Sequence, residues 1–163
     1  MTTTSGTAKV TLPADNQILI TREFAAPRHL VWRAYTEPEL IKRWWAGDKG
    51  NVTSVEVDLR VGGRWRYVMT ANHGFEVAFH GEYRELTAPE RMVNTEAYEG
   101  IPDPDGNAAL NTVTLTEKDG RTFLEVLVEC KDRASRDAII ESGMESGMQA
   151  SYDALEQVAA ALS

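Results

Sequence analysis

The chain has 163 residues, 42% of them hydrophobic and 26% charged, which is the composition of a folded domain and not of a disordered segment. Acidic residues outnumber basic ones by 25 to 17, so the net charge is −8, and without a dense run of Lys or Arg nucleic acid is not an expected partner. No signal-peptide pattern and no apolar run of about 18 residues occurs, and the single cysteine cannot form an internal disulfide, so we expect a cytoplasmic protein without membrane insertion.

The first part of the chain predicts a flexible leader followed by a strand and a helix. Residues 1–16 are expected to be the leader, and residues 17–163 to form one domain. The segment Gln17 to Phe24 is β-branched and apolar over the length of a strand. Pro27 then suits the first turn of a short helix.

Three of the four tryptophans lie between Val31 and Trp45. Within this stretch, the residues from Thr36 to Glu39 have the form of a capping box, which predicts that a second helix starts there. This helix would carry Trp44 and Trp45, and adjacent residues on a helix point about 100° apart. We therefore expect at most one of the two rings to border a cavity while its neighbour packs, and a structural role for both rings is the alternative that we favour.

Six further strands are predicted from alternating apolar and polar residues, with turn residues at most junctions, near positions 53–59, 63–70, 75–86, 92–98, 111–116 and 122–131. Such an arrangement favours a meander of antiparallel hairpins. The segment Glu99 to Ala109 holds two prolines and two glycines and is the longest loop expected inside the domain.

The last segment, about Ser135 to Leu162, has an apolar stripe at helical spacing and predicts the longest helix. Gly143 and Gly147 lie inside it, and glycine destabilises a helix interior by about 1 kcal/mol relative to alanine. Either a close packing approach or a break near the start of the helix would explain them.

The fold class expected from these elements is α+β, with the order β-α-α-β6-α and a seven-stranded curved antiparallel sheet around a long C-terminal helix. Four motifs in this order resemble the START-like helix-grip superfamily, also labelled SRPBCC, and within it the single-domain relatives of the heat-shock protein 90 ATPase activator. These motifs are REFAAP and VWRAYTEPELIKRWW within 22–45, DLRVGGRWRYVM at 58–69, GEYRELTAPERMVNTE at 81–96 and GMQASYDALEQVAAAL at 147–162. Met148 departs from the family pattern, which usually has tryptophan there.

The resemblance implies a deep apolar cavity between the sheet and the C-terminal helix. Relatives in the superfamily bind lipids, sterols, plant hormones or polyketides in this cavity, and some catalyse cyclisation or hydrolysis there. Co-chaperone activity belongs to longer eukaryotic proteins with an additional domain. A chaperone partner is therefore the less favoured expectation, although a stress-related role is consistent with the family.

Strand periodicity selects the side chains that would face such a cavity. Trp65, Tyr67 and Met69 share one face of a predicted strand, and a stripe from Phe75 through Val77 to Tyr83 shares a face of the next, with the small Gly81 expected to leave space. The same side chains could instead interdigitate as an ordinary packed core. The candidate ligand-pocket residues are Trp44, Trp45, Trp65, Tyr67, Met69, Phe79, Tyr83, Met144, Met148 and Tyr152.

No catalytic constellation is visible in the sequence. It lacks a G-x-S-x-G elbow and a phosphate-binding glycine pattern, and Cys130 has no histidine at a diagnostic spacing. His80 and Glu82 share a strand face expected to meet solvent, and only His73 is near enough to be a third ligand, so neither a metal nor another cofactor is predicted. Glu96 could act as an acid or base if it projected into the cavity.

The sequence therefore favours the binding of a small or medium hydrophobic ligand of unknown identity. One alternative is a cyclase, dehydratase or hydrolase that acts on a polyketide-like substrate in the same cavity, and it requires an ionisable group on the cavity wall. Another is an interaction module for a chaperone, which requires an exposed apolar patch. The sequence does not distinguish a monomer from a homodimer.

Overall fold

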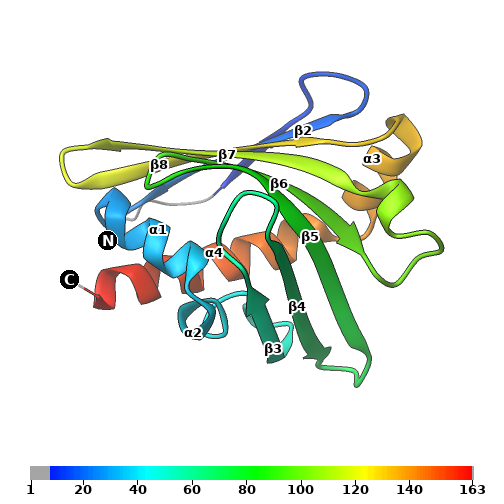
Figure 1. The fold of residues 1–163 in the computed structure, drawn as a ribbon, viewed down its shortest axis with the longest axis horizontal. Coiled ribbons are helices and arrows are strands. Elements are labelled where there is room, and N and C mark those ends of the chain that lie inside the picture. Colours follow the sequence, from blue (N-terminus) through cyan, green and yellow to red (C-terminus); the bar gives the residue numbers. More distant parts are fainter. Residues whose placement is uncertain (1–7, 163) are drawn as a thin grey trace.

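The structure, a computed structural model, describes residues 8–162. It contains one antiparallel sheet of eight strands in the order β1-β2-β8-β7-β6-β5-β4-β3. The sheet is strongly curved, and β3, β4 and β5 bend away from the remaining strands (Figure 1). The strands are β1 Lys9–Thr11, β2 Gln17–Phe24, β3 Gly50–Val57, β4 Arg64–Ala71, β5 Glu76–Thr87, β6 Arg91–Tyr98, β7 Ala109–Lys118 and β8 Arg121–Glu129.

Helices α1, α2 and α4 lie on the concave side of this sheet, and α3 lies at one end of it, as Figure 1 shows. The longest, α4, runs beneath the sheet and packs against α1. Their bounds are α1 Arg28–Thr36, α2 Pro38–Ile41, the short 3-10 helix η1 Asp105–Asn107, α3 Arg133–Glu141 and α4 Met144–Ala161. Within residues 8–162, no helix combines the length and the apolar character that crossing a membrane would require.

The prediction of seven strands, with a flexible leader up to residue 16, is wrong for the described part of that leader. Lys9 to Thr11 form β1, which pairs with β2 from Lys9 opposite Thr21 to Thr11 opposite Leu19. The Gln149 side chain of α4 also holds the backbone of Ala8 through two hydrogen bonds of 3.0 and 2.8 Å. Three residues of mostly polar character carry too little periodicity to indicate a strand. Residues 1–7 lie outside the described residues.

The C-terminal segment forms two helices instead of the single one expected. Gly143 separates them with a φ of +84°, in the left-handed region that glycine adopts most easily. Asp132 caps the first turn of α3, because its carboxylate accepts a hydrogen bond of 2.8 Å from the Ser135 amide. The predicted break near the start of the helix is therefore confirmed at Gly143.

The predicted capping box at residues 36–39 does not form. The Thr36 hydroxyl donates to the carbonyl of Trp32 at 2.8 Å, and α2 begins at Pro38 without a side-chain cap. α2 ends at Ile41, so Trp44 and Trp45 lie in successive turns and not on a helix. The start of α2 is therefore set by Pro38 at the first helical position and not by a Thr36 cap.

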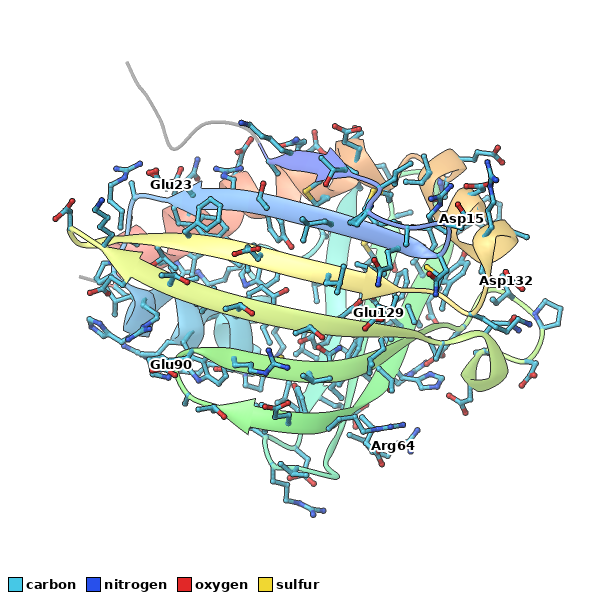
Figure 2. The ribbon with its side chains drawn as sticks, turned by 90° about the horizontal axis from the view of Figure 1, so that it is seen from above. Asp15, Glu23, Arg64, Glu90, Glu129 and Asp132 are labelled. Carbon is cyan, nitrogen blue, oxygen red and sulfur yellow. The ribbon has the colours of Figure 1, made fainter. Side chains whose placement is uncertain are left out.

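One end of the molecule is a fully packed core around α1, β2 and the second half of α4. Phe24, Leu124 and Leu155 are fully buried there. Arg22 of β2 is buried as well, and its guanidinium binds Asp153 of α4 at 2.8 Å and lies over the Phe24 ring at 5.2 Å. The outer face of the sheet carries charged side chains, such as Glu23 on β2 and Glu129 on β8, with α4 behind it (Figure 2).

Candidate functional site

At the other end, the concave face of the sheet and the start of α4 enclose a cavity of about 730 Å³. Strands β4 to β8, the turns after α2, the loop after β6 and both C-terminal helices contribute to its wall. All ten residues of the predicted pocket lie on this wall, namely Trp44, Trp45, Trp65, Tyr67, Met69, Phe79, Tyr83, Met144, Met148 and Tyr152. The structure therefore brings them together around unfilled space.

The two adjacent tryptophans have different contacts. Trp44 is buried, and its indole donates a hydrogen bond of 2.7 Å to the Ala34 carbonyl of α1. Trp45 is half-buried and meets Tyr67 edge-on at 5.4 Å between ring centroids and Phe79 at 5.8 Å. Trp44 thus anchors the turns to α1, while Trp45 joins the aromatic wall formed by β4 and β5.

Two expectations for β5 are wrong. Phe75 does not face inward, because it lies in the turn before the strand and is 71% exposed. Gly81 does not leave free space, since a side chain there would collide with the Thr95 carbonyl and with the Trp65 indole nitrogen. The Trp65 ring occupies the room that the missing side chain provides.

The cavity also has a polar group that the predicted pocket did not include. Asn94 and Glu96 of β6 and Asn111 of β7 all border it, and Asn94 lies directly opposite Asn111 in the sheet. The Asn111 amide donates a hydrogen bond of 2.9 Å to Glu96 Oε1. Met92, Asn94 and Glu96 alternate along the strand, so period-two spacing from the buried Met92 was the available signal for an inward Glu96.

Burial raises the pKa of Glu96, and the hydrogen bond from Asn111 opposes this only in part. Glu96 itself is half-buried and borders the cavity. Burial also raises the pKa of Tyr83 and that of Tyr152 to about 12, and places the pKa of Tyr35 and Tyr67 well above the ordinary value of 10.0. The tyrosine hydroxyls are therefore neutral, and Tyr35 on α1 is a further wall residue that the predicted pocket lacked.

The loop from residue 99 to 108 borders the cavity through Ile101 and Asn107. It is fastened to the sheet at two places. His80 of β5 contacts Glu99 through Nδ1 at 2.8 Å and Asp105 through Nε2 at 2.5 Å. On the other side, Lys131 donates a hydrogen bond of 3.0 Å to the Asn107 side chain.

His80 and Glu82 do share the outer strand face, as predicted, but they take different partners. Hydrogen bonds to Asp105 and Glu99 raise the pKa of His80, while hydrogen bonds from Arg66 and His80 lower the pKa of Glu99 to about 2. Glu82 instead pairs with Arg84 at 2.7 Å. Across residues 8–162, no three His, Cys, Asp or Glu side chains gather in a way that could hold a metal ion.

The family model described as Activator of Hsp90 ATPase homolog 1-like protein matches residues 25–160 of this sequence. The chain belongs to this family. Membership in this family, which is part of the START-like superfamily, is consistent with the observed antiparallel sheet and the long helix packed on it. The chain therefore has a helix-grip fold, with eight strands in its sheet. The matched region runs from just before α1 almost to the end of α4 and so includes most of the cavity wall.

Solved bacterial structures resemble the chain over nearly its whole length. A protein of Rhodobacter sphaeroides is 26% identical with a TM-score of 0.85, and the match covers 94% of this chain and 99% of that one. A protein of Mycobacterium smegmatis is 27% identical with a TM-score of 0.81, over 95% and 96% of the two chains. One of Chromobacterium violaceum is 28% identical with a TM-score of 0.74, over 88% and 96%. No curated protein matches the chain.

Proposed function

We propose that the protein binds a small or medium hydrophobic molecule in the cavity between its sheet and α4. The observation that carries this proposal is the unfilled volume of about 730 Å³, bordered by aromatic rings on β4 and β5 and by Met144 and Met148 of α4. Concave, mostly apolar spaces of this size are typical of small-molecule sites. Burial of apolar ligand surface would drive binding, at about 25 cal/mol per Å².

The test is a titration with the neutral apolar dye N-phenyl-1-naphthylamine, whose emission rises in apolar surroundings. Wild type should bind it saturably at one site. Gly147→Phe should lose that binding, because Gly147 borders the cavity and a side chain built there meets nothing within 4 Å, so the new ring extends into the space. Gln157→Phe, which adds the same ring at an exposed position of α4, is the matched control and should bind as wild type does.

An acid–base reaction in the same cavity is a second candidate, and the position of Glu96 favours it. A carboxyl group on the cavity wall is placed to exchange a proton with a bound molecule, as dehydration and hydrolysis require. The check is mass spectrometry of a bacterial metabolite extract incubated with wild type or with Glu96→Gln. A compound that loses or gains water with wild type alone would support an enzyme, and identical spectra would contradict it.

Binding to a chaperone stays a prediction that rests on the family resemblance alone. Among the described residues, the exposed large apolar side chains lie on several segments, and two of them, Tyr98 and Ile101, border the cavity. Phe75 lies before β5, Val61 in the turn before β4, and Phe123 on β8. None of these three side chains borders the cavity.

A further inference from the structure

Glu96 and Asn111 form the polar centre of a cavity that is otherwise mostly apolar. They lie on the neighbouring strands β6 and β7, and the Asn111 amide nitrogen donates to Glu96 Oε1 at 2.9 Å. Asn111 is only 9% exposed, yet its Oδ1 atom has no hydrogen-bond partner among the described residues. A buried oxygen of this kind destabilises the fold when it stays unpaired. Asn111 therefore contributes its amide nitrogen to Glu96, and its own oxygen stays buried in the wall.

The tyrosines near Glu96 are engaged elsewhere. The Tyr35 hydroxyl interacts with that of Tyr152, and the Tyr67 hydroxyl with that of Tyr83. Asn111 is the one hydrogen-bond donor that the structure gives to Glu96 within residues 8–162. The Glu96 carboxylate therefore borders the cavity with acceptor capacity that Asn111 does not use up, while Oδ1 of Asn111 is buried behind the wall.

The charge of the cavity wall points in the same direction. Glu96 is the only carboxyl group among the described wall residues, and Lys49 is the only amine. Lys49 is exposed at the rim of the cavity. Its amine binds the Ser146 hydroxyl at 3.0 Å and Asp48 at 3.5 Å, and it does not pair with Glu96. Among the described residues, Glu96 thus has no cation beside it that would offset the effect of burial on its pKa.

We propose that the cavity selects an apolar molecule with a protonated primary or secondary amine, whose N–H groups bind the Glu96 carboxylate. This inference rests on the proposed function. An ammonium group supplies at least two donors and a positive charge, and the faces of nearby aromatic rings also favour a cation. A ligand hydroxyl supplies a single donor, and a ligand carboxylate would be repelled by Glu96.

The experiment measures displacement of bound N-phenyl-1-naphthylamine by octylamine, 1-octanol and octanoate at neutral pH, in a range where none of them forms micelles. Because charge-assisted hydrogen bonds are stronger than neutral ones, octylamine should displace the dye from wild type at a concentration lower by about tenfold than either competitor. Glu96→Gln keeps the shape of the side chain and should reduce this preference to about twofold while still binding the dye. Glu125→Gln removes the same charge from the exposed outer face of β8 and should keep the full preference.

Each result separates the two proposals. If the dye does not bind to wild type, the proposed function fails and this inference fails with it. If the dye binds but octylamine competes no better than 1-octanol, the amine assignment is overturned and the apolar site remains. Persistence of the preference in Glu96→Gln would also overturn it. Because the comparison of the three octyl compounds uses wild type, it decides the question even if Glu96→Gln does not fold.

Discussion

The two halves of α4 meet the same sheet in different ways. In the second half, Leu155 is fully buried and Val158 is nearly so. In the first half, Met144, Gly147 and Met148 are only half-buried and border a cavity. One helix therefore serves both as part of a packed core and as the wall of an unfilled space.

The difference lies in side-chain size and in attachment to the sheet. At the packed end, Arg22 fastens α4 through Asp153, and Tyr152 meets the Phe24 ring edge-on at 5.8 Å. At the cavity end, nothing lies within 4 Å of a side chain built at Gly147. The comparison teaches that the packed half can hold the helix in place, so the other half is free to leave space for a ligand.

The largest expected effect comes from truncating the packed half. Leu155→Ala should lower the free energy of unfolding by about 2–5 kcal/mol, because it removes a fully buried side chain and leaves a void. Met148→Ala should lower it by less than about 1 kcal/mol, since that side chain already borders empty space. Urea unfolding followed by tryptophan fluorescence measures both values. Equal losses in the two variants would contradict the division of α4 into two halves.

The two glycines near the start of α4 should respond to alanine with opposite signs. Gly143→Ala should destabilise the protein by about 1 kcal/mol, because a φ of +84° is strained for any residue with a side chain. Gly147→Ala should stabilise it by about 0.5–1 kcal/mol through higher helix propensity, with free room for the methyl group. Thermal unfolding of the two variants gives the comparison. A loss of stability in both would show that Gly147 has a packing role.

The smallest effect is expected at the loop that borders the cavity. The pKa of His80 is raised above its ordinary value of 6.5 by Asp105 and Glu99, so the stabilisation it gives is complete below 6.5 and is lost as the pH rises through the pKa of the folded state. From about pH 6 to about pH 9, wild type should therefore lose several tenths of a kcal/mol more stability than His80→Gln, a small value because Asp105 is largely exposed.

At acid pH, Glu99 of the same cluster gives stability the opposite dependence on pH. The pKa of Glu99 is lowered to about 2, so its contribution is present above the ordinary value of 4.5 and is lost as the pH falls toward 2. Urea unfolding at several pH values, with His80→Gln as the comparison, measures both dependences. Parallel pH curves for the two proteins would show that His80 does not fasten the loop.

Much of the fold follows from local pattern. Six strands after α2 were predictable to within a few residues, because alternation and turn chemistry act over short stretches. β1 was not, since three residues gain their strand conformation only by pairing with β2. The capping box failed because Thr36 found a better partner in the carbonyl four residues before it.

The cavity wall was partly predictable as well. Strand periodicity selects the inward aromatic residues, but it does not say whether they meet each other or surround space. That outcome depends on the break at Gly143 and on the distance between α4 and the sheet. The hydrogen bond between Glu96 and Asn111 could not be predicted, because predicting it requires the register between β6 and β7. A shift of one residue would turn either side chain to the opposite face.

The pairing of β2 with β8 has a consequence for how the chain folds. Gln17 pairs with Glu129, and the two residues are 112 positions apart. During synthesis, β2 therefore emerges from the ribosome long before β8. Almost all of the domain must be synthesised before β2 and β8 can pair. Pairings over such separations slow folding, with times of about milliseconds to seconds. The nascent chain would hold an apolar strand with one edge unpaired through most of its translation, which is a state that chaperones protect.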